Sequence, residues 1–101
     1  MQGKYEDAID AYTKSIELDP FYYGTYYNRG VAYYHLGQYN KAIQDYNKAI
    51  ELDPNYALTY YNRAVGYHQI GEYEKAVDDF NKAVELDPNL DSDKRIPWRI
   101  I

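Results

Sequence analysis

The chain has 101 residues, enough for one domain, and its 16 acidic and 11 basic residues give a formal net charge of −5. Nucleic-acid binding draws on clustered cations, and no run of Lys or Arg exists beyond Lys94-Arg95, so this balance argues against a nucleic-acid partner. The absence of cysteine excludes disulfides, thiolate catalysis and thiolate metal sites. Since no apolar run approaches the ~20 residues that span a bilayer and no signal-peptide pattern opens the chain, we expect a cytoplasmic protein without membrane contact.

The sequence repeats with a step of 34 residues, marked by Asp19-Pro20, Asp53-Pro54 and Asp87-Pro88. Residues 23–56 and 57–90 share 20 identities in 34 positions. A repeat of this length is typical of a solenoid, in which each unit buries its apolar face only against its neighbours. Because such arrays expose extended surfaces, the pattern favours binding over catalysis.

The predicted elements follow in chain order as helices over 3–19, 22–36, 39–52, 56–70 and a last one that begins near Tyr73. Apolar or small residues form one stripe on the helix over 39–52. Gly37 and Gly71 stand where a left-handed residue would end a helix, and each Asp-Pro pair disfavours helical geometry at the aspartate. Equivalent stripes occur at Tyr39, Ala42, Ile43, Tyr46, Ala49 and Ile50; at Tyr73, Ala76, Val77, Phe80, Ala83 and Val84; and at Tyr5, Ala8, Ile9, Tyr12, Ser15 and Ile16.

This spacing of aromatic, small and proline residues resembles the tetratricopeptide repeat family. The resemblance covers residues 3–90 and implies an all-α solenoid of antiparallel helix pairs with about two and a half repeats. We expect an array over 1–90, made of a second helix of a truncated repeat (3–22) and two repeats (23–56 and 57–90), followed by a non-repeat tail (91–101). The family's marker positions are filled by Tyr26, Gly30, Tyr33, Ala42, Tyr46 and Pro54, and again by Tyr60, Ala64, Tyr67, Ala76, Phe80 and Pro88.

Charged residues on the helices are spaced for local pairing, as in Asp10 with Lys14, Lys41 with Asp45 and Asp78 with Lys82. A solvated helix face explains these pairs. Arg29 and Arg63 stand where the family commonly has Leu. We expect each arginine to pair with a nearby acid rather than to contact a ligand.

Catalysis has little support in this sequence. The only histidines, His35 and His68, are not repeat equivalents. Metal-binding His-Glu-x-x-His, phosphate-binding glycine loops and the Gly-x-Ser-x-Gly elbow are missing. We therefore expect no enzyme activity, no metal site and no cofactor.

The resemblance implies that the first helix of each unit lines a concave groove. Asn28 and Asn62 are the strongest candidates for peptide contact there, because a side-chain amide can both donate hydrogen bonds to an extended peptide and accept them from it. The alternative is that the two amides only bond between neighbouring helices. The candidate peptide-binding residues are Tyr27, Asn28, Val31, Tyr34, Tyr61, Asn62, Val65 and His68.

Family members that clamp the C-terminal carboxylates of heat-shock chaperones carry an Asn at this place, together with lysines and an arginine on neighbouring first helices. Here those places hold Tyr27, Tyr61, Gly24, Leu58 and Val31, so the resemblance does not predict chaperone-tail binding.

Two functions follow as hypotheses. The first is a protein–protein interaction scaffold that holds a protein or peptide partner in the groove. The alternative is a self-assembling module, because both ends of the array are cut within the repeat and expose side chains meant for a neighbour. Under that alternative, homo-oligomers form through stacked or exchanged ends. The apolar tail residues Ile96, Trp98, Ile100 and Ile101 fold back over the last helix or dock on a neighbour, and the alternative is a disordered tail.

Overall fold

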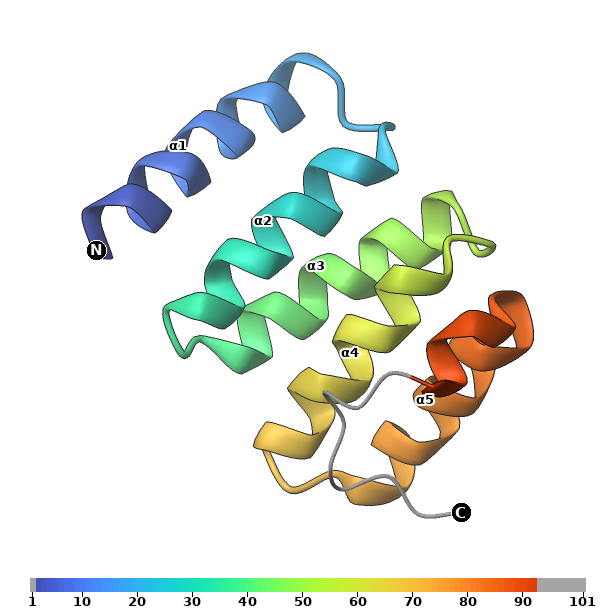
Figure 1. The fold of residues 1–101 in the computed structure, drawn as a ribbon. Helices are drawn as coiled ribbons and strands as arrows, with labels where there is room; N and C mark the ends of the chain where they lie inside the picture. Colours follow the sequence, from blue (N-terminus) through green and yellow to red (C-terminus); the bar gives the residue numbers. More distant parts are fainter. Residues whose placement is uncertain (1, 93–101) are drawn as a thin grey trace.

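The structure, a computed structural model, describes residues 2–92, and this part of the chain is helical without any strand (Figure 1). The all-α prediction is therefore confirmed, and the predicted helix bounds differ from the observed ones by one or two residues. The helices are α1 (Gln2–Leu18), α2 (Tyr23–His35), α3 (Tyr39–Leu52), α4 (Ala57–Gln69), α5 (Tyr73–Leu86) and a short 3-10 helix, η1 (Pro88–Ser92).

Successive helices stack side by side in alternating directions instead of surrounding a common centre (Figure 1). Each helix packs on its neighbours in the sequence: α1 on α2, α2 on α3, α3 on α4 and α4 on α5. η1 packs on α5, and among the described elements α2 and α4, the first helices of the two full units, are the one packed pair that is not consecutive in the sequence. This arrangement is the predicted solenoid of helix pairs.

Glycine ends α2 and α4, as the sequence predicts. Gly37 and Gly71 have φ values of 76° and 84°, the left-handed region that side chains with a Cβ avoid. In the first turn, the Gln38 amide donates to the Tyr33 carbonyl at 2.9 Å and the Gly37 amide donates to the Tyr34 carbonyl at 2.9 Å. This pair of bonds satisfies two carbonyls at the end of α2 and reverses the chain into α3.

The Asp-Pro turns are closed by side chains from both sides. The Asp53 carboxylate accepts a hydrogen bond from the Asn55 amide at 3.0 Å, and Asp19 and Asp87 bond in the same way. The hydroxyl of Tyr60 donates to the Pro54 carbonyl at 2.9 Å, and Tyr26 repeats this bond to Pro20. These two tyrosines therefore bury their rings and use their polar ends to hold the turn before each first helix.

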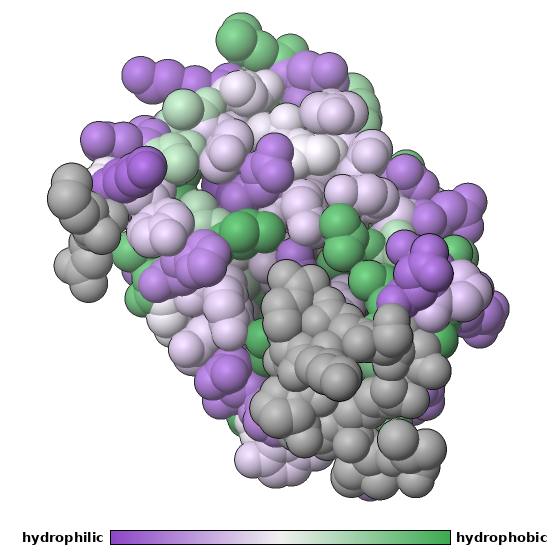
Figure 2. Space-filling view, in the orientation of Figure 1, coloured by the Kyte–Doolittle hydropathy of each residue, from purple (hydrophilic) through white to green (hydrophobic). Residues whose placement is uncertain are grey.

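The core lies between the helices and depends on small residues. The alanines of the packing stripes, Ala42, Ala49, Ala64, Ala76 and Ala83, are completely buried. Gly30 allows the closest approach, because a Cβ there would lie 2.6 Å from the Tyr46 ring. Ala64 stands at the equivalent place in the next unit, facing Phe80. On the face shown in Figure 2, hydrophilic residues gather mainly along the rim, with paler and hydrophobic residues between them.

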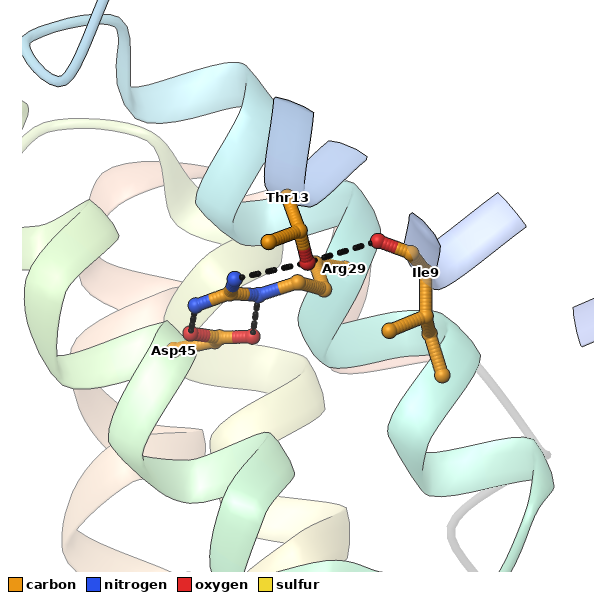
Figure 3. Close-up of polar contacts among 4 residues, drawn as sticks. All are labelled: Ile9, Thr13, Arg29 and Asp45. Atoms are coloured by element: carbon orange, nitrogen blue, oxygen red, sulfur yellow. Dashed lines mark hydrogen bonds and ion pairs between the residues drawn. The ribbon is translucent and has the colours of Figure 1, made fainter. Parts of the chain in front are cut away.

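Each arginine of the repeat joins three helices through one side chain. Arg29, on α2, makes a two-point ion pair with Asp45 on α3, with both nitrogen–oxygen distances at 2.8 Å, and also donates to the Thr13 hydroxyl on α1 at 3.2 Å (Figure 3). Arg63 repeats the pattern, with Asp79 at 2.6 and 2.7 Å and with Asn47 at 2.8 Å. The expected pairing of both arginines with acids is confirmed.

The predicted four-apart ion pairs are wrong. Asp45 faces Arg29 instead of Lys41, whose ammonium lies 5.6 Å from the centre of the Tyr33 ring. Lys82 pairs with Glu85 at 3.6 Å instead of with Asp78, and no ion pair joins Asp10 to Lys14 among the described residues. Asp45 is nearly buried. It pairs with Arg29 on the neighbouring helix because a two-point bond to a guanidinium is stronger than a single bond to the flexible Lys41 on its own helix.

The predicted tail over 91–101 is covered only at its start, where η1 extends to Ser92 and packs against α5. Ile96, Trp98, Ile100 and Ile101 lie outside the described residues.

Candidate functional site: two adjoining hollows

The central hollow is an open pocket between α2, α3 and α4, with a volume of about 220 Å³. Its walls come from α2 and α4, the first helices of the two full units, and Tyr46 of α3 lines it between them. The lining residues are Val31, Tyr34, His35, Tyr46, Asn62 and Val65.

The N-terminal hollow lies between α1 and α2 and has a volume of about 310 Å³. Val31 lines both hollows, so they adjoin at α2, and the two together are called the groove below. The lining residues are Lys4, Tyr5, Ala8, Tyr12, Asn28, Val31 and Ala32.

The structure brings five of the eight predicted peptide-binding residues into this groove. Val31, Tyr34, Asn62 and Val65 line the central hollow, and Asn28 lines the N-terminal hollow together with Val31. Their shared face follows from the helical period, since those on the same first helix lie three residues apart. Asn28 is exposed, whereas Asn62 is half-buried.

Tyr27 belongs to a cluster of aromatic rings behind the groove. Its ring meets that of Tyr56 edge-on, with ring centres 5.3 Å apart, and its hydroxyl accepts a hydrogen bond from the Asn62 amide at 2.8 Å. Burial raises the pKa of Tyr27, with a further contribution from Tyr56, while the bond from Asn62 acts in the opposite direction. Asn62 thus makes the interhelical bond of the alternative interpretation, although it also lines the central hollow.

Tyr61 and His68 lie away from the two hollows. Tyr61 is only 5% exposed and packs against Phe80, in a cluster that also contains Ala64 and Ala83. A peptide contact of Tyr61 stays a prediction, although this side chain is buried whereas its repeat equivalent, Tyr27, is half-buried. His68 contacts the Tyr73 ring, with ring centres 5.0 Å apart.

The sequence interpretation missed the contributions of the second helices. Tyr46 on α3 and Tyr5, Ala8 and Tyr12 on α1 belong to the packing stripes, yet all four also line a hollow. One signal was available for Tyr46: the equivalent position in the next unit is Phe80. Because a packing position does not need this hydroxyl, its presence in one full unit alone is the signal that could have marked Tyr46 as a groove residue.

Charges are nearly absent from the groove. Among the residues that line the two hollows, Lys4 is the one acidic or basic side chain apart from His35. The first helices contain no acid and no lysine, and their two arginines are bound to Asp45 and Asp79. The bonds to Asp45 raise the pKa of Arg29. Burial acts to lower the pKa of Arg63, but the bonds and charge of Asp79 together outweigh it.

Neither a metal site nor a membrane span is formed by the part of the chain that the structure describes. Residues 2–92 contain no group of three or more His, Cys, Asp or Glu side chains placed to hold a metal ion. None of the helices in that range combines the length and the apolar character needed to cross a bilayer. What the groove offers chemically is apolar walls, tyrosine hydroxyls and amide groups.

Two family models match the chain. One, described as tetratricopeptide repeat, matches residues 24–56 and 57–90, and the other, described as TPR repeat, matches residues 1–37. A search of curated proteins gave no match.

Solved structures of this kind resemble the chain closely. The first TPR of Spaghetti (RPAP3), bound to the HSP90 peptide SRMEEVD, is 36% identical over 87% of this chain and 70% of its own length, with a TM-score of 0.84. The second TPR domain of human RPAP3, in complex with the HSP70 peptide SGPTIEEVD, is 34% identical over 85% of this chain and 72% of its own, with a TM-score of 0.82. MamA is 31% identical over 89% of this chain, with a TM-score of 0.81, and the chain spans about half (53%) of its length.

Proposed function

Because the chain belongs to the tetratricopeptide repeat family, we propose that it is a protein–protein interaction scaffold that binds a peptide segment in the groove formed by the central and N-terminal hollows. The observation that carries this proposal is that two hollows adjoin at Val31, on the face of α2 that the repeat spacing predicts for binding. An extended peptide lying across α2 would place side chains in both. The two RPAP3 domains support it, since their structures contain peptides.

The proposed contacts come from the predicted residues that line the hollows. Asn28 offers a free amide to the peptide main chain, and Asn62 offers its amide oxygen, because its nitrogen is bound to Tyr27. Val31, Tyr34 and Val65 supply apolar walls. Tyr27 acts through Asn62, and His68 stands at the end of α4, next to Tyr73. Stacked helices hold these groups in place before binding, so the partner bears most of the ordering entropy.

Peptides selected from a random display library, with the 101-residue chain as bait, test the proposal. We expect dissociation constants of roughly micromolar strength, about −8 kcal/mol. Val31→Asp places a charge in both hollows and should weaken binding at least tenfold. Asn28→Ala should weaken it several-fold without unfolding the array, because Asn28 is exposed.

Asn81→Ala is the matched control, since Asn81 is an exposed asparagine on α5 outside both hollows. Fluorescence anisotropy with a labelled selected peptide measures all three variants. A library that yields no binder, or equal affinity for wild type and Val31→Asp, would refute peptide binding in this groove.

Self-association is the second candidate function, and the exposed apolar residues at the α1–α2 turn favour it. Leu18 and Tyr22 are 89% and 55% exposed, whereas their repeat equivalents, Leu52 and Tyr56, are half-buried. Tyr56 packs on Tyr23 and Tyr27 of the preceding first helix, and among the described elements α1 has no such helix on its open side. A helix of a second copy could occupy that place.

Light scattering over a range of concentrations tests this second candidate. If copies associate through the α1–α2 turn, the mass of the wild-type chain should rise with concentration and that of a Leu18→Ser, Phe21→Ser variant should not. Truncation to residues 1–90 separates the contribution of the tail. A monomeric mass for all three proteins would exclude self-association.

A further inference from the structure

The Tyr46 hydroxyl is a nearly buried polar group without a partner. Tyr46 is only 1% exposed, and no hydrogen bond from or to its hydroxyl occurs among the described residues. In the same range, the fully buried side-chain polar atom that lacks a partner is Thr59 Oγ1. The Tyr46 hydroxyl is therefore not sealed. Because Tyr46 lines the central hollow, we infer that the small exposed part of its side chain is the hydroxyl end and that this end faces the hollow.

Burial keeps this hydroxyl neutral at any physiological pH, since burial first of all, and then the neighbouring Tyr27 and Tyr34, raise the pKa of Tyr46. A neutral phenol both donates and accepts a hydrogen bond. A second polar group lines the same hollow: the Asn62 side chain, whose nitrogen is committed to Tyr27 and whose oxygen remains an acceptor. The hollow therefore combines a donor–acceptor and an acceptor beneath apolar walls.

These walls limit what can reach the two polar groups. Val31 and Val65 stand on the facing first helices, so a side chain entering between them must have an apolar body. The volume of about 220 Å³ suits one ring, since an engineered cavity of about 150 Å³ holds benzene. No acidic group lines the hollow to match a Lys or Arg. Serine and threonine carry their hydroxyl too close to the main chain to reach beyond the walls.

Building on the proposed peptide-binding function, we propose that the central hollow is a specificity pocket for a tyrosine side chain of the partner peptide. The partner's ring lies between Val31 and Val65, and its phenol donates to the Asn62 amide oxygen and accepts from the Tyr46 hydroxyl. The Tyr46 hydroxyl and the Asn62 amide oxygen then both have a partner. A phenylalanine at the same place leaves both unpartnered, which costs binding free energy because these groups lose water without a replacement bond.

Paired peptides test the proposal. A peptide selected from the display library against the 101-residue chain is synthesised with its tyrosine and with phenylalanine in that place, both carrying blocked ends. For the wild-type chain we expect the tyrosine peptide to bind about tenfold more tightly, because the phenylalanine peptide lacks two hydrogen bonds worth about threefold each. For Tyr46→Phe we expect the two peptides to bind within about threefold. That variant should fold, because Phe80 fills the equivalent position of the next unit.

Tyr12→Phe is the matched control. Tyr12 is the repeat equivalent of Tyr46 but lines the N-terminal hollow, so this variant should keep the tenfold preference. Two results would overturn the inference while leaving peptide binding intact: selected peptides that share no tyrosine, or a preference that Tyr46→Phe leaves unchanged. A preference abolished by Tyr12→Phe would also overturn it. A library without any binder would instead refute the proposed function itself.

Discussion

At the residue scale, equivalent positions of the two full units lie in different surroundings. Tyr27 is half-buried and bonded to Asn62, whereas Tyr61 is buried against Phe80. The arginines behave alike, since Arg29 and Arg63 each grip an aspartate and reach the preceding second helix. Roles repeated in both units therefore maintain the stack. Roles found in one unit only, such as the Tyr46 hydroxyl, are candidates for recognition.

Asp79→Asn should lower the free energy of unfolding by about 1.5–3 kcal/mol, the usual worth of hydrogen bonds to a charged group. The reason is that Arg63, whose side chain is 19% exposed, would lose its charged partner while remaining largely out of water. Urea unfolding followed by circular dichroism measures the change. Glu51→Gln serves as control, because the Lys48–Glu51 pair is exposed and should be worth less than about 0.5 kcal/mol. Equal effects of the two substitutions would contradict this account.

Thr59→Val should stabilise the array by about 1 kcal/mol. The Thr59 side chain is fully buried and its hydroxyl lacks a hydrogen-bond partner, which usually costs about 1–3 kcal/mol. Valine keeps the branched shape without the hydroxyl and has a similar helix propensity. The same denaturation experiment applies to Thr25→Val, whose equivalent hydroxyl is only partly buried and should show a smaller gain. Loss of stability in Thr59→Val would reveal a bond that the hydroxyl makes in solution.

At the element scale, the glycine turns fix how each first helix meets its second. Gly37 and Gly71 occupy left-handed backbone in which any residue with a Cβ is strained. We expect Gly37→Ala to cost about 1–2 kcal/mol of unfolding free energy, and Gly37→Asn to cost less, because asparagine tolerates this region.

Gly3→Ala provides a control of opposite sign for the turn variants. Gly3 lies within α1, and a Cβ there would have no atom within 4 Å. The helix propensity of alanine should then raise stability by up to about 1 kcal/mol. Thermal unfolding of the three variants measures the order. A stabilising Gly37→Ala would mean that the turn does not hold its left-handed geometry in solution.

The helices were predictable because their signals are local. The apolar period, the glycines and the Asp-Pro pairs placed the predicted ends of the five α-helices to within one or two residues, whereas η1 was not predicted. The site was less predictable because it depends on contacts between units. Nothing near Tyr61 in the sequence says that Phe80 covers it, and nothing near Asp45 says that Arg29 displaces Lys41. The spacing of residues on the first helices, α2 and α4, predicted which of their faces lines the groove. Tyr46 instead reaches the groove from α3, a second helix.

At the scale of the whole molecule, the charged side chains lie mostly outside the groove. The chain carries a formal net charge of −5, and its acids lie outside α2 and α4. Among the described residues that line the groove, Lys4 and His35 are the ones with acidic or basic side chains. Long-range attraction of a charged peptide therefore has little source in the groove itself, and recognition has to come from apolar contact and hydrogen bonds.

Peptide binding should accordingly be almost independent of salt. Between about 50 mM and 500 mM NaCl at pH 7.5, we expect the dissociation constant of a selected neutral peptide to change less than about twofold, because screening acts on exposed charges.

The acidic peptide SRMEEVD, found with the first TPR of RPAP3, should bind this chain at least tenfold more weakly than a selected neutral peptide. Val65→Lys places a cation in the central hollow and should improve SRMEEVD binding at low salt only. Fluorescence anisotropy at both salt concentrations measures these changes, and tight, salt-sensitive binding of SRMEEVD to the wild-type chain would show that cations beyond those described here take part.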